Sequence, residues 1–518
     1  MNRCFLLLVD GLRPDVAQAR LEAGDLPHLA AMLERGGRTQ AITGFPSTTS
    51  VAYLPFLTGC TPGHCDVPSI RWLDRKTYRG RWWRDRNAIR SYCGYQAPLV
   101  DCDIQPAVRT IFELVPESLG IFTPVARGLT AGRDPCRLER KLWGSLAHVA
   151  QWHQPSDDSV SRHLIRSVGG GWRFVFAQFP AVDGYTHQSG YDSAVVCRAL
   201  TRIDATVGRL RQLLRTRGEL EESLILLVSD HGASRVHTHL DLADWFRSQG
   251  VPTLAHPALW ERRPRAAVMV AGNGSAMVYA RPGEPRPDRW PVERLRRLDA
   301  FGSRSDLVAA LLREPSVAFV AGESEGGIWI GSEAGAARLS RRGEELVYQP
   351  LTGDPLQVGR FRSAPAREWL EATWNGPFPD APFHLFDQFR SRRSGDLVVM
   401  AREGYDFRAR FEVPEHRYGH GSLIRAHMQT PVWSSRPIAS RPLRTVDLFP
   451  AVLSWLGEEV PGGIDGEPVW LPGRRGPAAS PPDLVRQLDE EAIAGPAQVG
   501  KREPVVRFQE TAIAEEGD

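Results

Sequence analysis

Acidic residues and histidines occur together at several points of the sequence, in spacings that suit metal binding. Asp10 follows the apolar segment CFLLLV, and Asp230 and His231 follow LILLVS. Asp183 and His187 are four residues apart in VDGYTH, so one helical turn would place both on the same face. Carboxylate oxygens and neutral imidazole nitrogens are ligands that zinc-type divalent ions bind well. A single pair of this kind usually has a structural role, so the metal hypothesis requires several of them to converge.

Three apolar segments precede these acidic side chains and must position them. They are residues 4–9, 174–179 and 224–228. Each is continuous rather than alternating, which is typical of strands covered on both faces of a parallel sheet. Because ligands of open α/β sheets bind outside the carboxyl ends of the strands, we expect the acidic residues to meet there. An apolar stripe over 196–214, with spacings of three and four, predicts a helix and a right-handed βαβ unit over 172–229.

The bulk composition predicts a globular protein with a large core rather than a protein that coats polynucleotides. Its 518 residues are 42% hydrophobic, enough for a large core, and the formal net charge is only +3. So small a charge argues against a protein that coats polynucleotides. No apolar stretch approaches the roughly 18 residues that a membrane span needs. The seven scattered cysteines do not form a disulfide pattern, and we expect reduced thiols in a cytoplasmic protein.

Two stretches look inserted between the parts that carry these signals. Residues 66–150 are rich in Arg, Trp and Tyr, and residues 235–395 mix short strands with turns rich in Pro and Gly. We expect both to form a cap on a catalytic domain that spans 1–475. Residues 476–518 read as a polar C-terminal tail.

The order of the motifs resembles the alkaline phosphatase superfamily, and most closely its type I phosphodiesterase / nucleotide pyrophosphatase branch. The motifs are VDGLRPD, a Thr nine residues before Thr58-Gly59, DxxxH, SDHG and HGS, the last of which contains His420. They cover about 1–60, 170–235 and 415–470. The resemblance implies a three-layer α/β/α sandwich with a central, mostly parallel sheet.

The resemblance also implies two metal sites and a nucleophile. One site would consist of Asp10, Asp230 and His231 with the Thr49 hydroxyl, and the other of Asp183, His187 and His420. Thr49 would attack phosphorus, and the phosphothreonine would then be hydrolysed. The implied cofactors are two divalent ions, zinc before manganese or iron. Ser47, Thr48 and Ser50 are alternative nucleophiles, but the distance to Thr58-Gly59 favours Thr49.

One departure from the branch concerns the phosphoryl group. The branch usually has an Asn soon after its TG-x-x-P segment, but residues 61–72 contain none. Arg71 is a candidate replacement, because a guanidinium suits phosphate oxygens. It opens a segment, 71–95, whose basic and aromatic residues suit either a nucleotide or a packed cap.

The function that follows is metal-dependent hydrolysis of a phosphodiester or pyrophosphate bond in a small-molecule phosphoester. A phosphomonoesterase or phosphonate hydrolase of the same fold stays open, as does a phosphotransferase. A non-catalytic binding protein is the alternative from a different class. We expect no polynucleotide and no membrane partner, and the sequence leaves the oligomeric state open.

Overall fold

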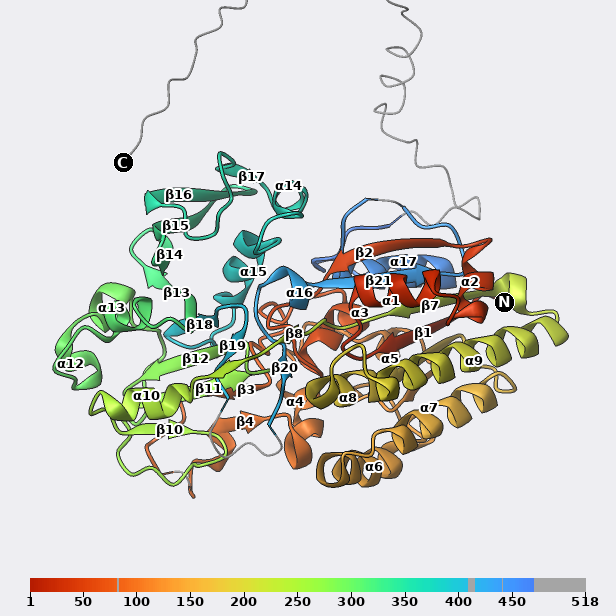
Figure 1. Cartoon of the computed structure of the whole chain (residues 1–518), viewed down its shortest axis with the longest axis horizontal. Helices are drawn as coiled ribbons and strands as arrows, with labels where there is room; N and C mark the ends of the chain where they lie inside the picture. The colour runs from red at the N-terminus through yellow and green to blue at the C-terminus, as the bar shows by residue number, and fades with distance from the viewer. Residues whose placement is uncertain (82, 409–414, 440, 470–518) are drawn as a thin grey trace, which may run out of the picture. The chain divides into compact units, whose positions relative to one another are not determined.

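A seven-stranded sheet forms the centre of the computed structural model, which describes residues 1–469 except 82, 409–414 and 440 (Figure 1). The strand order is β22–β2–β21–β7–β1–β6–β5. The bounds, in that order, are Leu443–Arg444, Gly37–Ile42, Gln429–Ser434, Ser223–Val228, Arg3–Val9, Phe174–Phe179 and Ser118–Ile121. Strands β7, β1, β6 and β5 are parallel neighbours, whereas β21 is antiparallel to both β7 and β2. The sheet is therefore mostly parallel, as predicted.

Strand β1 shows why these apolar runs are continuous. Its residues are all buried, and they alternate between two apolar clusters on the two faces of the sheet. Leu6 and Leu8 belong to one cluster, and Leu7 and Val9 to the other. Both faces are therefore covered, as expected of a central parallel strand.

Helices supply the two outer layers. On one face pack α1 (Pro14–Glu22), α2 (Pro27–Leu33), α7 (Gln154–Ser167) and α9 (Ala194–Thr216). On the other face pack α3 (Leu54–Thr58), α5 (Ile111–Leu114) and α17 (Leu448–Leu456). Figure 1 shows α7 and α9 below β1, and α17 above it. The predicted three-layer α/β/α sandwich is confirmed.

The chain between the motifs builds further structure. Residues 66–150 contribute the hairpin of β3 (Arg71–Leu73) and β4 (Ile89–Ser91), helices α4 (Val100–Asp103) and α6 (Arg137–Ala150), and the edge strand β5 of the central sheet. A second sheet of nine strands, in the order β10–β11–β12–β18–β13–β14–β15–β16–β17, comes from later residues. Its bounds, in that order, are Thr253–Ala255, Ala266–Ala271, Ser275–Ala280, Leu397–Ala401, Val317–Ser324, Gly327–Ser332, Gly335–Arg342, Glu345–Gly353 and Ser363–Pro365.

Short elements complete the described residues. The helices are α8 (Ala181–Ser189), α10 (Leu242–Ser248), α11 (Val292–Leu295), α12 (Leu298–Phe301), α13 (Leu307–Leu312), α14 (Ala366–Thr373), α15 (Ala381–Gln388) and α16 (Arg425–Met428). The strands are β8 (Ser234–Arg235), β9 (Thr238–His239), β19 (Tyr405–Asp406) and β20 (Tyr418–Gly419). Within these ranges, no helix is both long and apolar enough to cross a bilayer. The predicted tail, 476–518, and Trp82 lie outside the described residues, and the cytoplasmic location stays a prediction.

Candidate metal centre

The three acidic motifs meet at one edge of the central sheet because β7, β1 and β6 are adjacent and parallel. Asp10 follows β1 directly, and Asp230 and His231 follow β7 after one serine. Asp183 lies in the first turn of α8, which begins two residues after β6, and His187 lies one turn further along. The carboxyl ends of the strands therefore bring together side chains that are far apart in the sequence.

Asp10, Asp230 and His231 form a first potential cage. Their ligand atoms all lie within 4.8 Å of one another, and all three side chains are buried. The His231 Nε2 atom is 3.4 Å from Asp10 Oδ1 and 3.3 Å from Asp230 Oδ2. A carboxylate–carboxylate–imidazole set of this kind suits a divalent transition metal.

Asp183, His187 and His420 lie beside it and outline a second cage. The His187 Nε2 atom is 3.1 Å from Asp183 Oδ2, and the His187 and His420 rings are 5.2 Å apart at their centroids. The ligand atoms that lie within 4.8 Å of one another here belong to Asp183, His420 and His231, so His187 is the predicted ligand outside this group. The His231 and His420 rings stack with their centroids 3.8 Å apart, so the two cages are in contact through these rings.

Thr49 is the hydroxyl of its segment that faces the first cage. Its Oγ1 atom is 3.4 Å from both Asp10 Oδ1 and His231 Nε2. Thr49 is partly exposed, whereas Ser47, Thr48 and Ser50 are buried. The Ser47 hydroxyl donates instead to the Ser422 carbonyl at 3.0 Å. These contacts favour Thr49 over its neighbours as the reactive hydroxyl.

The carboxylates of this cluster need nearby cations in order to stay ionised. Burial and the nearby Asp183 charge raise the pKa of Asp10 to about 7, and burial and the Asp10 charge raise the pKa of Asp230 well above its usual value. Burial lowers the pKa of His231 well below its usual value, which favours the neutral, metal-binding imidazole. For Asp183, burial is outweighed by His187, and the pKa is lowered. Crowded carboxylates are stable as anions only next to compensating positive charge.

Two buried oxygen atoms test whether the site fits metal ions. Among the described residues, neither Asp183 Oδ1 nor Asp230 Oδ2 has a hydrogen-bond partner. A buried carboxylate oxygen without a partner is costly, and a coordinated ion removes that cost. Gly11 keeps the space open: a Cβ atom there would lie 2.7 Å from Asp183 Oδ1, and its φ of 72° also disfavours other residues. The residues therefore fit divalent ions in both cages.

Several supporting residues were not predicted from the sequence. The Asp10 Oδ2 atom accepts hydrogen bonds from Tyr53 Oη at 3.0 Å and Gln178 Nε2 at 2.8 Å. Gln178 was a recognisable signal, because it is the one polar residue in the buried strand FVFAQF. His416 stacks on His187 with ring centroids 4.2 Å apart, and its spacing of four from His420 was visible in HRYGH.

The nine-stranded sheet contacts the second cage through the turn between β11 and β12. Asn273 pairs with His420 in an isolated parallel bridge, and the Gly274 N–H donates to the His420 carbonyl at 2.7 Å. A Cβ atom on Gly272 would lie 2.7 Å from His420 Nδ1 and 2.8 Å from Thr48 Cγ2. This turn therefore determines where His420 stands.

Arg71 lies near the same turn. Its Nη1 atom donates to the Val270 carbonyl of β11 at 3.1 Å. Within the segment 71–95, Trp72 and Tyr92 are buried and hydrogen-bonded to each other, whereas Trp83 and Tyr95 are exposed. Substrate binding by Arg71 stays a prediction.

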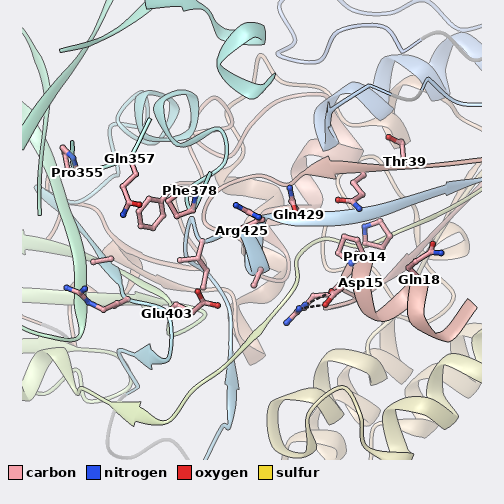
Figure 2. A pocket seen from close by; sticks show the side chains of 18 of the residues that line it. Pro14, Asp15, Gln18, Thr39, Pro355, Gln357, Phe378, Glu403, Arg425 and Gln429 are labelled. Carbon is pink, nitrogen blue, oxygen red and sulfur yellow. Dashed lines mark hydrogen bonds and ion pairs between the residues drawn. The ribbon is translucent and has the colours of Figure 1, made fainter. Parts of the chain in front are cut away.

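Two other features are separate from the cages. A groove of about 1180 Å³ runs past Asp15, Gln357, Phe378 and Glu403, and no cage residue lines it (Figure 2). A third group of potential ligands consists of Cys60 and His64, which follow α3, and Asp465, which follows α17.

Hydrogen bonds saturate the carboxylate of that third group. Asp465 Oδ2 accepts from the Thr61 N–H at 2.9 Å, the Thr61 hydroxyl at 2.8 Å and His64 Nδ1 at 2.9 Å, and Oδ1 accepts from Arg390 at 3.0 Å. We interpret this group as a tether for the loop that follows α3.

Comparisons with known proteins found a family match and structures of similar fold. The profile of the type I phosphodiesterase / nucleotide pyrophosphatase family matches residues 4–423. A phosphonoacetate hydrolase from Sinorhizobium meliloti 1021 is similar in structure, with a TM-score of 0.53, 14% identity, and coverage of 88% of this chain and 96% of that chain. An inactive variant of murine ectonucleotide pyrophosphatase / phosphodiesterase 5, solved with AMP, gives 0.51, 11%, 89% and 96% for the same four values. A search of curated protein sequences found no match.

Proposed function

Because the chain belongs to the type I phosphodiesterase / nucleotide pyrophosphatase family, and is thus a phosphoric ester hydrolase, we propose that it cleaves a phosphodiester or pyrophosphate bond through a phosphothreonine on Thr49. The observation that carries the proposal is the position of the Thr49 hydroxyl. It is 3.4 Å from two residues of a carboxylate–imidazole cage and partly exposed to an incoming substrate.

The residues divide the work between the two cages. Asp10, Asp230 and His231 would hold one divalent ion next to Thr49, and Asp183, His187 and His420 would hold another. Bound ions of this kind lower the pKa of a coordinated hydroxyl or water and neutralise charge on phosphoryl oxygens. We expect zinc, with manganese or iron as alternatives, because the ligand set suits all three.

The reaction then needs mainly positioning. The Thr49 oxygen attacks phosphorus and loses its proton, the bond from phosphorus to the leaving oxygen breaks, and that oxygen departs on the opposite side. Water next attacks the phosphothreonine, which releases the phosphoryl product and restores the Thr49 hydroxyl. Phosphoryl transfer requires little more from a protein than alignment and charge neutralisation.

The proposal can be tested with the Thr49→Ala variant. We expect it to lose turnover of bis(p-nitrophenyl) phosphate by on the order of 10³-fold or more, because the nucleophile is gone. Its metal content should stay near that of the wild type. Thr49→Ser, which keeps a hydroxyl, is the matched control and should keep measurable activity.

Two measurements complete this test. Wild-type enzyme that is acid-quenched during turnover of bis(p-nitrophenyl) phosphate should carry a p-nitrophenyl phosphoryl group on Thr49, detected by mass spectrometry. Full activity of Thr49→Ala would refute the assignment. A higher rate on p-nitrophenyl phosphate than on the diester would favour a phosphomonoesterase instead.

A further inference from the structure

His427 is a buried histidine outside the two cages, and it contacts two loops of the candidate centre. It belongs to the short helix α16. Its Nε2 atom is 2.9 Å from Ser234 Oγ, and its Nδ1 atom is 2.8 Å from Ser422 Oγ. Its carbonyl accepts a hydrogen bond from the Gly232 N–H at 3.0 Å. Ring and backbone thus bind the loop after β7 on one side and the loop after β20 on the other.

These two loops carry one histidine ligand of each cage. Gly232 comes directly after His231, which belongs to the first cage. Ser422 comes two residues after His420, which belongs to the second cage. His427 therefore connects the ligand loops of the two cages through its own side chain and carbonyl.

The same network reaches the segment that carries the proposed nucleophile. The Ser47 hydroxyl donates to the Ser422 carbonyl at 3.0 Å, and the His420 Nδ1 atom is 2.9 Å from the Ser47 carbonyl. Because a carbonyl only accepts, the His420 Nδ1 atom carries its proton, which leaves the lone pair for metal binding on Nε2. A shift of Ser422 would therefore disturb both His420 and the segment 47–49.

The hydrogen-bond directions show how the His427 ring is held. The Ser422 N–H donates to Nδ1 at 3.2 Å. Since a backbone N–H can only donate, Nδ1 accepts, and the proton of the neutral ring lies on Nε2 and is donated to Ser234 Oγ. The site thus requires an acceptor toward one loop and a donor toward the other, and a neutral imidazole supplies both.

We propose that His427 is a positioning residue that fixes the two ligand loops relative to each other, so that His231 and His420 hold their ions in the alignment that phosphoryl transfer requires. This inference rests on the proposed two-metal hydrolysis and adds a residue outside the ligand set. The loops also pair directly, through Ser234 in β8 and Gly419 in β20. Loss of the ring should therefore disturb the ligands more than the fold.

The test uses three substitutions of this ring. His427→Phe keeps a flat ring and removes both side-chain hydrogen bonds. In His427→Asn the amide reaches the position of Nδ1 and can accept from Ser422, and in His427→Gln it reaches the position of Nε2 and can donate to Ser234. We expect His427→Phe to lower kcat on bis(p-nitrophenyl) phosphate about 10- to 100-fold and to change KM less than about two-fold, because residues beyond the ligands act on alignment rather than on substrate binding.

Zinc affinity assigns each hydrogen bond to one cage. Asp183→Ala should retain only the ion of the first cage, and Asp230→Ala only that of the second. In both backgrounds we expect His427→Phe to weaken zinc binding about ten-fold, measured by competition with a chelator. His427→Gln should restore most of the affinity of the first cage, and His427→Asn most of that of the second. Ser234→Ala and Ser422→Ala, which each remove one partner, should weaken the same respective cages and serve if His427→Phe does not fold.

The matched control is His384→Phe, because His384 is also buried but belongs to α15. We expect it to leave kcat and zinc affinity unchanged. A His427→Phe variant that only unfolds more easily, with wild-type kcat and zinc affinity, would overturn the positioning role. Failure of both His427→Gln and His427→Asn to restore any zinc affinity would also overturn it.

The outcomes also separate this inference from the proposed function. Either of those negative results would leave the assignment of Thr49 in place, since that assignment depends on Thr49→Ala and on the trapped intermediate. A wild-type chain that binds no divalent ion and turns over no phosphoester would overturn both proposals.

Discussion

The seven-stranded and nine-stranded sheets contribute to the candidate centre in different ways. The seven-stranded sheet supplies side chains, because Asp10, Asp183 and Asp230 follow the carboxyl ends of three adjacent strands. The nine-stranded sheet supplies backbone, because its β11–β12 turn packs against His420. Ligand residues have a chemical type and spacing that a sequence displays, whereas a supporting turn has neither. We therefore expect substitutions at the seven-stranded sheet to remove metal ligands. Substitutions at the nine-stranded sheet should instead move a ligand, His420, out of position.

The largest effect is expected for single removals of cage carboxylates. Asp230→Ala and Asp183→Ala should each lower turnover by on the order of 10³-fold, because each leaves one ion without a charged ligand. Metal analysis should show one ion lost per chain, from different cages in the two variants.

His420→Ala sharpens this prediction. It should lose the same ion as Asp183→Ala, so that the double variant loses no more than either single one. Loss of two ions in the double variant would contradict the assignment of Asp183 and His420 to one cage.

A buried ion pair between the central sheet and the start of α15 gives the next largest effect. Arg444 of β22 in the central sheet pairs with Asp380, which precedes α15, through contacts of 2.6 and 2.9 Å, and both residues are buried. Asp380→Ala should lower the free energy of unfolding by about 3–5 kcal/mol, because it leaves a buried guanidinium without a carboxylate. Denaturant titration measures this.

The control for Asp380 lies in the turn between β15 and β16 of the nine-stranded sheet. Glu344 forms an exposed pair with Arg341 at 2.8 Å. Glu344→Ala should leave the unfolding midpoint almost unchanged, since exposed ion pairs contribute little. An equally small change for Asp380→Ala would contradict a stabilising role for the buried pair.

A substitution in the β11–β12 turn tests the effect of displacing the ligand His420 without removing it. Gly272→Ala should lower kcat by about 10- to 100-fold, because a misplaced ligand costs alignment. Excess metal in the assay should restore part of the activity. Gly343→Ala is the matched control, since Gly343 has a similar φ of 60° but no atom within 4 Å of an added Cβ. Equal kcat values for the two variants would show that the turn does not position His420.

These contacts also show what the sequence could reveal. The parallel strands and the acidic candidate ligands followed from continuous apolar runs with Asp at or just beyond their ends, because those signals are local, whereas the three layers and His420 needed the resemblance. Thr49 needed the resemblance, since four consecutive hydroxyl residues look alike until burial distinguishes them. The β11–β12 turn and the Arg444–Asp380 pair join residues far apart in sequence, so no local pattern shows them.

Substitution of Arg71 has the smallest expected effect. It tests whether Arg71 acts by supporting the β11–β12 turn. Its guanidinium donates to the Val270 carbonyl, two residues before Gly272, so it supports the turn from behind. Arg71→Ala should lower kcat/KM about three-fold, as for loss of one hydrogen bond, and combining it with Gly272→Ala should add little. If Arg71 instead binds the phosphoryl group, as its replacement of the family Asn would require, the loss should approach 100-fold and should add fully to that of Gly272→Ala. Steady-state kinetics of the two single variants and the double variant therefore decide whether Arg71 acts through the second sheet or directly on substrate.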